Sequence, residues 1–299
     1  MSAVPGTPDI AYAAPKRRHP VATFLVQQPL GAAGLGVIVV MILAAVFAPW
    51  VAPYDPLQVD YVNILAAPSA EHWLGTDNFG RDVLSRIIYG AQTALSVGFL
   101  ASILGSTVGA VIGVTSAYFG GRIDMAIQRL MDILLSFPII VLALAVVAIL
   151  GKNIVLGVDV NLVIAIGLPM VPKVARVVRS AALAIREMPY IDAARTAGFS
   201  HSRIIFRHIV PNVTAPYLIM LTAFVGQAIL LEASLSFLGL GVTEPTPAWG
   251  LMLSGSAIGF YQQAPWMIVF PGLAISLAVF AFNLFGDSLR DWLDPKLKL

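Results

Sequence analysis

Residues 93–118, TALSVGFLASILGSTVGAVIGVTSAY, carry no charged side chain. A helix needs about 20 predominantly apolar residues to cross the hydrocarbon core of a bilayer. Within this stretch Gly105, Gly109 and Gly113 recur every four residues. Small residues at this spacing let two helices approach each other closely in lipid. The stretch therefore predicts a transmembrane helix that packs tightly against a neighbour.

The composition of the whole chain agrees with a membrane protein. Of its 299 residues, 58% are hydrophobic and only 11% are charged, with a mean hydropathy of +0.85. A soluble domain has about 25% charged residues. The chain has no cysteine, which excludes disulfides and thiolate metal sites. The apolar run at 31–51 is longer than the core of a signal peptide, so it predicts a retained first span.

We expect six transmembrane helices, at about 31–51, 93–118, 124–150, 162–184, 215–238 and 266–285. The fourth has an apolar part, 162–172, that is too short to span the membrane alone. It must continue through Lys173, Arg176 and Arg179, whose spacing of three places them on one helical face. Prolines within these helices, Pro138, Pro169 and Pro172, are expected to kink them.

The distribution of basic residues predicts the orientation. With the N-terminus in the cytoplasm, 15 of the 18 basic residues lie inside, in agreement with the positive-inside rule. The inside set is Lys16, Arg17, Arg18, Arg122, Arg129, Lys173, Arg176, Arg179, Arg186, Arg195, Arg203, Arg207, Arg290, Lys296 and Lys298. The outside set is Arg81, Arg86 and Lys152. The expected fold is all-α, with six spans and both termini cytoplasmic.

This topology divides the chain into five parts. They are a cytoplasmic N-terminal tail (1–30), a first transmembrane helix (31–51), a periplasmic segment (52–92), a five-helix core (93–288) and a cytoplasmic C-terminal tail (289–299). The core contains a cytoplasmic segment at 187–211. Residues 1–15 are rich in Ala, Pro and Gly, and we expect them to be disordered.

Residues 189–211, PYIDAARTAGFSHSRIIFRHIVP, form a charged island between two spans. Pro189 suits the first turn of a helix, Gly198 suits the left-handed position that ends one, and Ser200 can cap the next. Pro211 is expected to break this second helix before the fifth span begins. The pattern fits either a helix that inserts into a groove on another protein or an amphipathic helix on anionic lipid headgroups.

Several kinds of chemistry are absent from the sequence. No P-loop, no G-x-S-x-G nucleophile elbow and no cluster of metal ligands is present. Few acidic residues lie in or next to the membrane: Asp132 is early in the third span, Glu232 is in the fifth and Asp287 is at the inner end of the sixth, which disfavours self-powered transport. Glu232 allows two interpretations. One is a helix–helix hydrogen bond near the periplasmic rim, and the other is a polar lining of the substrate pathway or its outer gate.

The island carries a family resemblance. Asp192-Ala193-Ala194, then Gly198, then Ile209-Val210-Pro211, closely resembles the EAA motif of ABC importer permeases. In that family this segment docks on the ATPase subunit, so we call residues 187–211 the coupling segment. The chain departs from the pattern with Asp192 in place of Glu and His208 in place of Ile. The resemblance assigns ATPase coupling to Asp192, Ala193, Ala194, Arg195, Gly198 and Pro211.

Further motifs extend the resemblance over about residues 71–295. They resemble the dipeptide and oligopeptide permeases, and in particular the C-type subunit of that group. The matching stretches are LGTD at 74–77, GRDVLSR at 80–86, SFLGLG at 236–241, PTP at 245–247, FPGLA at 270–274, FNLFGD at 282–287 and LDP at 293–295.

The resemblance implies a type I ABC importer permease in the bacterial inner membrane, surrounded by lipid. It implies a non-catalytic subunit that pairs with a second homologous permease and with two ATPase subunits, which carry ATP and Mg. It implies no cofactor on this chain and no nucleic acid. Loops 52–90 and 239–265 would face a periplasmic solute-binding protein that delivers di- or oligopeptides.

Alternatives remain open for the substrate, the class of protein and the outer segment. The same architecture serves nickel, glutathione, opines or oligosaccharides, and another class is a self-sufficient carrier or channel. For residues 74–86, contact with the binding protein competes with a scaffold role. In the scaffold role Asp77, Arg81, Asp82 and Arg86 pair among themselves.

Overall fold

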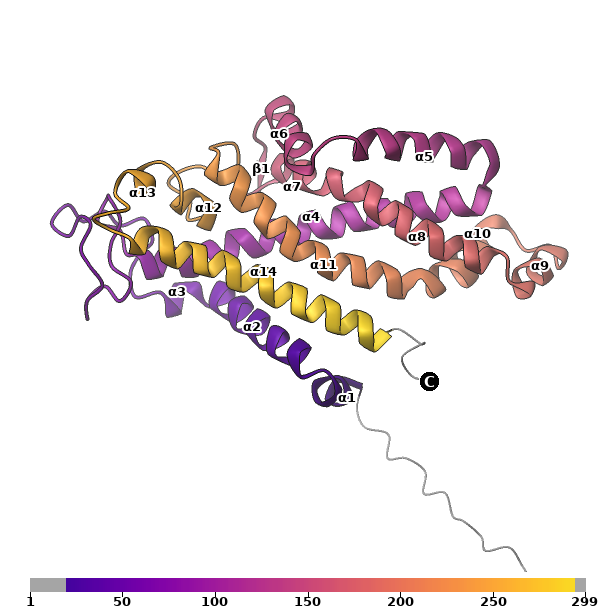
Figure 1. Ribbon diagram of the computed structural model, residues 1–299, viewed down its shortest axis with the longest axis horizontal. Helices are drawn as coiled ribbons and strands as arrows, with labels where there is room; N and C mark the ends of the chain where they lie inside the picture. Colours follow the sequence, from indigo (N-terminus) through magenta and orange to yellow (C-terminus); the bar gives the residue numbers. More distant parts are fainter. Residues whose placement is uncertain (1–19, 294–299) are drawn as a thin grey trace, which may run out of the picture.

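The computed structural model describes residues 20–293, which form an elongated bundle of long helices with loops at one end (Figure 1). The expected disorder of residues 1–15, and the basic residues at positions 16–18, 296 and 298, lie outside the described residues. Within them, five helical runs are long and apolar enough to span a membrane. One bent helix pair brings the number to six. The helical fold is confirmed, with the small addition of a two-stranded hairpin.

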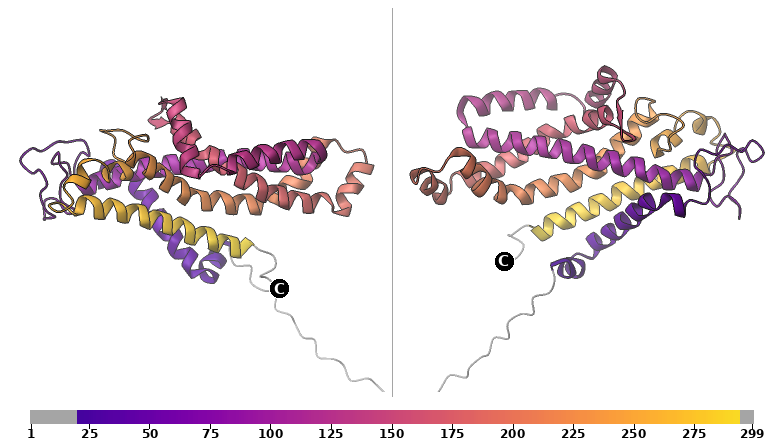
Figure 2. Two further views of the ribbon diagram at one scale, coloured as in Figure 1. Left: turned by 45° about the horizontal axis from the view of Figure 1, so that its top comes forward. Right: turned by 180° about the vertical axis from the view of Figure 1, so that it is seen from behind.

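The chain enters and leaves the bundle at the same end. Helix α1 (Pro20–Gln27) precedes α2 (Pro29–Val46) and the short α3 (Ala48–Val51), so the first span is interrupted at Phe47. The ring of Phe24 in α1 packs edge-on against Phe285 at 6.0 Å and Trp292 at 5.9 Å. Both aromatic partners belong to the end of α14 (Trp266–Leu293). Figure 2 shows α2 and α14 side by side along the bundle.

Helix α4 (Val83–Phe119) is the central element of the bundle. It has 37 residues and begins well before the expected residue 93, because the Asp82 side chain accepts a hydrogen bond from Ser85 N at 2.8 Å and caps it. Its glycine row lies directly on the fourth span. A Cβ added at Gly105 would approach Gly167 O to 2.5 Å, and one at Gly109 would approach Val171 O to 2.7 Å. The predicted close packing is confirmed.

The third span, expected at 124–150 with a kink at Pro138, is broken at that proline. Helices α5 (Gly121–Leu135) and α6 (Ile139–Leu150) meet at 93°. Pro138 lies at the break, where it lacks a backbone N–H and forces the preceding residue away from helical geometry. A hairpin of β1 (Ile154–Val155) and β2 (Val158–Asp159) follows α6.

The fourth span continues through its arginines, as predicted. It consists of α7 (Val160–Gly167), the 3-10 turn η1 (Leu168–Met170) and α8 (Val171–Arg186). Arg176 and Arg179 both face α5. Arg176 pairs with Asp132, and Arg179 Nε donates to Asp124 Oδ1 at 2.6 Å. The shared face is therefore occupied by two ion pairs between helices.

The prediction that Pro211 breaks the helix before the fifth span is wrong. Helix α9 (Pro189–Thr196) is followed by α10 (His201–Ile204), the π turn η2 (Ile205–Ile209) and α11 (Val210–Phe237). Residues 201–237 form one continuous run. Pro211 lies in the first turn of α11, and the π turn before it absorbs the change in hydrogen bonding. The short helices α12 (Trp249–Met252) and α13 (Ser256–Gly259) lead into α14.

Candidate functional site

The coupling segment lies at the end of the bundle that carries α9 and α10, which we call the inner end (Figure 1). Pro189 begins α9, and Gly198 ends it with a φ of +77°. The Gly198 N–H donates to Arg195 O, and the Phe199 N–H donates to Ala194 O. Ser200 Oγ then accepts from Arg203 N at 3.4 Å and caps α10. The predicted helix–turn–helix is confirmed.

The two faces of α9 have different environments. Ile191 and Ala194 are buried against the bundle, whereas Asp192 and Ala193 are exposed. Asp192 Oδ1 lies 3.2 Å from Arg195 Nη1, with side-chain exposures of 70% and 42%. An ion pair this exposed to solvent contributes little to the stability of the fold. The residues assigned to ATPase coupling therefore divide into a buried alanine and a solvent-facing group, which includes Gly198 and Pro211.

Residues that the sequence analysis missed attach the coupling segment to the bundle. The hydroxyl of Tyr118, at the end of α4, lies 2.7 Å from His201 Nδ1. The guanidinium of Arg195 lies 5.9 Å from the centre of the Tyr118 ring. Arg186 Nη1 donates to Ala117 O at 2.7 Å. The end of α4 therefore contacts both α8 and the coupling segment. In the sequence, the available signal for Tyr118 was an aromatic residue at the end of a long apolar helix.

The turn inside the coupling segment is held by aromatic contacts. The ring of His208 stacks on Phe199 with an interplanar angle of 13° and lies 6.2 Å from Tyr190. The guanidinium of Arg203 also lies over Phe199, 3.8 Å from the centre of its ring. His208 was noted as a departure from the family pattern. In the structure it packs the turn against the π segment.

Glu232 is fully buried near the opposite end of α11. Its Oε1 accepts a hydrogen bond from Ser236 Oγ at 2.7 Å, and Ser236 Oγ accepts one from Val242 N at 3.0 Å. Ser236 lies one turn further along α11 itself, so this hydrogen bond stays within one helix. Glu232 Oε2 has no hydrogen-bond partner within residues 20–293.

The loops at the other end of the bundle, which we call the outer end, fold together into one cap. We define the outer cap as residues 52–82 and 238–265. Trp249 Nε1 donates to Ile87 O at 2.9 Å, and Trp266 Nε1 donates to Thr76 O at 3.0 Å. Thr93 Oγ1 donates to Pro247 O at 2.9 Å. Each bond joins residues more than 150 positions apart in the sequence.

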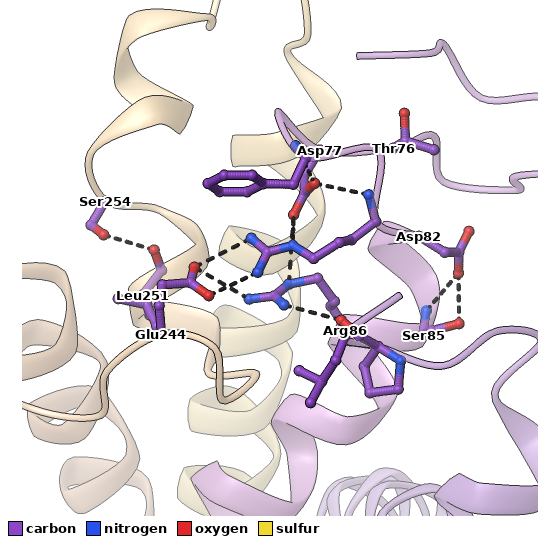
Figure 3. Close-up of polar contacts among 12 residues, drawn as sticks. Thr76, Asp77, Asp82, Ser85, Arg86, Glu244, Leu251 and Ser254 are labelled. Carbon is purple, nitrogen blue, oxygen red and sulfur yellow. Dashed lines mark hydrogen bonds and ion pairs between the residues drawn. The ribbon is translucent and has the colours of Figure 1, made fainter. Parts of the chain in front are cut away.

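An ion cluster lies at the centre of the outer cap (Figure 3). Arg81 Nε lies 2.6 Å from Asp77 Oδ2, and its Nη1 and Nη2 donate to the two oxygens of Glu244 at 2.8 and 3.3 Å. Arg86 Nη2 lies 3.5 Å from Glu244 Oε1. Asp82 instead pairs with His72 Nδ1 at 3.0 Å. The expectation that the four residues of 74–86 pair among themselves is only partly correct.

Glu244 was missed by the sequence analysis. It is the only charged residue between positions 239 and 265, which was the available signal. Burial acts to raise the pKa of Glu244, but the hydrogen bond from Arg81 and the charges of Arg86 and Arg81 hold it below its usual value. For Arg81, burial acts to lower the pKa, but Glu244 and Asp77 raise it above the ordinary value. Glu244 and Arg81 are therefore both ionised at neutral pH.

A cavity of about 240 Å³ adjoins this cluster. We call it the arginine pocket and define it by Asp77, Arg81, Arg86, Glu244, Leu251, Met252 and Met267. Besides these charged groups, its lining includes the apolar side chains of Leu251 and Met252 from α12 and of Met267 from α14. The arginine pocket therefore combines two cations with an apolar wall.

Comparison with known proteins gives the family. Residues 105–299 match the family described as the binding-protein-dependent transport system inner membrane component. Residues 21–68 match the N-terminal transmembrane domain of oligopeptide transport permease C. The chain belongs to this family of transport permeases and is a multi-pass protein of the inner membrane.

Individual relatives cover most of the chain. It is 47% identical over 274 residues to the dipeptide transport system permease protein DppC of Alkalihalophilus pseudofirmus, a match that covers 92% of this chain and 88% of the relative. It is 43% identical to the glutathione transport system permease protein GsiD of Escherichia coli, with 87% and 84% covered. The methionine ABC transporter MetNI is a structural neighbour with a TM-score of 0.49 and 16% identity, covering 69% of this chain and 97% of that one.

Proposed function

We propose that the chain is one of two permeases in an ATP-driven importer that also contains two ATPase subunits, and that its coupling segment docks on an ATPase subunit. The observation that carries this proposal is the geometry of α9. Its buried residues Ile191 and Ala194 belong to the hydrophobic core of the bundle, while Asp192 and Ala193 face solvent at the inner end. The sequence has no nucleotide-binding loop. ATP and Mg therefore belong to the ATPases, and this chain binds no cofactor.

The proposed cargo is a di- or oligopeptide delivered by a solute-binding protein at the outer cap. The relatives named for dipeptide and peptide transport support this substrate class. A relative named for glutathione keeps the alternative of another small solute, together with nickel, opines or oligosaccharides. A second homologous permease would complete the pathway.

The mechanism would use α4 as the mechanical link. Closure of the ATPases moves the coupling segment, which is bonded to the inner end of α4 through Tyr118. The same helix carries Arg86, Thr93 and Ile87, which contact the outer cap. A rearrangement at the inner end is thereby transmitted to the outer one.

Charge reversal of Asp192 tests ATPase docking. In the assembled transporter, Asp192→Lys is expected to abolish co-purification of the ATPases and peptide uptake while leaving the permease pair intact. Asp287→Lys is the matched control, because Asp287 is another exposed acid near the inner end, on α14. Normal ATPase association in Asp192→Lys would overturn the docking assignment. Uptake by the permease alone in liposomes without ATP would favour the self-sufficient carrier.

The role of Glu232 as a pathway lining or outer gate has its own test. Glu232→Gln keeps the shape and the hydrogen bond to Ser236 but removes the negative charge. If Glu232 acts in the gate, the assembled transporter should lose uptake at an unchanged level of insertion. Normal uptake would leave Glu232 with a structural role only.

A further inference from the structure

The two guanidinium groups of the arginine pocket are fixed in place. Side-chain exposure is 8% for Arg81 and 1% for Arg86. Arg81 is held by Asp77, and Arg86 Nη1 donates to Pro56 O at 3.1 Å. Arg86 Nη2 has no partner with hydrogen-bond geometry among the described residues. Its contact with Glu244 Oε1, at 3.5 Å, is longer than an ordinary hydrogen bond.

The charges of Arg81, Arg86 and Asp77 leave one positive charge, which a single monoanion can balance. Arg81 and Arg86 contribute two positive charges, and Asp77 contributes one negative charge. The remaining positive charge is matched at present by Glu244, whose two oxygens face both guanidinium groups. Planar guanidinium groups that grip both oxygens of one acceptor select a carboxylate. In the structure the Glu244 carboxylate occupies this position between the two guanidinium groups.

Unlike the two buried arginines, Glu244 is partly exposed to solvent, so its side chain has room to move out of the cluster. Its side chain is 47% exposed and belongs to the loop between α11 and α12. This loop is bonded to α4 further along, through Pro247 and Trp249. The Glu244 side chain can therefore rotate into solvent, with loosening of the residues next to it, while Pro247 and Trp249 stay bonded to α4.

We propose that the arginine pocket binds the C-terminal carboxylate of a small peptide in exchange for Glu244. The carboxylate would take the place of the Glu244 oxygens between Arg81 and Arg86. The apolar wall of Leu251, Met252 and Met267 would receive the side chain of the terminal residue. The choice of a peptide rests on the proposed function, whereas the choice of a carboxylate rests on the pocket itself.

The test compares one dipeptide in two forms. The complete transporter is placed in lipid nanodiscs without a solute-binding protein, and alanyl-leucine and its C-terminal amide are titrated by calorimetry. A tethered carboxylate competes at an effective concentration in the millimolar range or above. Removing it in Glu244→Gln is therefore expected to tighten alanyl-leucine binding by about tenfold or more over wild type. The amide should bind to neither protein.

Two further variants complete the test, one as a control and one as a conservative replacement of Glu244. Glu71→Gln is the matched control, because Glu71 is an exposed acid of the same cap that does not line the pocket, and it should behave as wild type. Glu244→Asp keeps the charge on a shorter arm and should give an intermediate affinity even if Glu244→Gln assembles poorly. Equal affinity for acid and amide, or no gain in either Glu244 variant, would overturn the proposal.

Other outcomes separate this inference from the proposed function. If wild type imports peptides with its solute-binding protein but no Glu244 variant binds alanyl-leucine, only the pocket assignment falls. If Glu244→Gln instead tightens association with the solute-binding protein alone, the pocket accepts a protein carboxylate and the peptide assignment is overturned. If a Glu244 variant binds alanyl-leucine although the transporter imports no peptide, the site stands and the proposed cargo falls.

Discussion

The protonation state of Glu244 affects how firmly its loop is held in the outer cap. Its pKa is lowered from 4.5 because Arg81 and Arg86 outweigh the effect of burial. A carboxylate with a lowered folded-state pKa stabilises the structure above the unfolded pKa and loses this contribution as the pH falls through the folded value. A spin label at Thr243→Cys, in a chain without other cysteines, should therefore stay immobile until the pH is well below 4.5.

The neutral variant gives the reference for this titration. With Glu244→Gln the same label should be mobile at every pH, because the ion pairs with the arginines are absent. The interpretation fails if the wild-type label is already as mobile at pH 7 as in the variant. Electron paramagnetic resonance line shapes provide the measurement.

Gly198 offers a second prediction for a single residue. Its φ of +77° lies in the left-handed region, and nothing lies within 4 Å of the position that a Cβ would occupy. Replacement by valine should therefore act through the backbone alone, at a local cost of about 1–2 kcal/mol. We expect the turn to open and ATP-dependent uptake to fall. Gly198→Asn, which tolerates this conformation better, should retain most of the uptake.

Local residue roles were predictable from the sequence, and distant ones were not. Pro189, Gly198 and Ser200 act within a few positions of themselves, so their types and spacing were sufficient. Glu244 meets Arg81 across 163 positions, and no periodicity links two loops so far apart. Tyr118 was hidden for the same reason, since its partner His201 lies 83 positions away.

Among the helices, the glycine face of α4 makes a direct prediction. A Cβ at Gly109 would lie 2.7 Å from both Val171 O and Val174 Cβ. Gly109→Ala should destabilise the protein by about 1–3 kcal/mol through overpacking. Gly36→Ala, on the exposed face of α2 with nothing within 4 Å, should instead gain about 0.5–1 kcal/mol in helix propensity. Thermal unfolding in detergent compares the two, and equal effects would contradict the packing argument.

The ion pairs between α5 and α8 lead to a second prediction about how the helices pack. Asp124 and Arg179 have side-chain exposures of 18% and 29%, so each single reversal leaves a partly buried charge unpaired. Asp124→Arg alone should cost about 1–2 kcal/mol, between the values for exposed and buried pairs. The double reversal with Arg179→Asp should recover part of this loss. A double-mutant cycle of unfolding free energies that shows no coupling would refute the pairing.

Helix boundaries were harder to predict than helix existence. Each expected apolar run is helical, yet Pro138 breaks one run while Pro211 fits inside another. A proline is tolerated where its missing N–H falls in the first turn, and disruptive where the helix would need that bond. The sequence does not show which case applies, because the π turn before α11 has no distinct residue pattern.

At the scale of the whole molecule, the number of spans and the tight seam of α4 followed from hydropathy, charge bias and glycine spacing. The outer cap did not, because its polar residues follow no helical or strand period. Its structure depends on tryptophan, threonine and arginine side chains that bond across the chain. The candidate coupling site was thus predictable in outline, whereas the arginine pocket required three-dimensional structure.

The length of α4 has a mechanical consequence. At 1.5 Å per residue, its 37 residues extend for about 55 Å, well beyond the hydrocarbon thickness of about 30 Å. Such a rod acts as a lever, with Tyr118 at one end and the arginine pocket at the other. By simple geometry, a tilt of about 10° around one end displaces the other by about 10 Å over this length. In the proposed transport cycle, a small rocking motion at the inner end would therefore be amplified into a larger displacement of the outer cap.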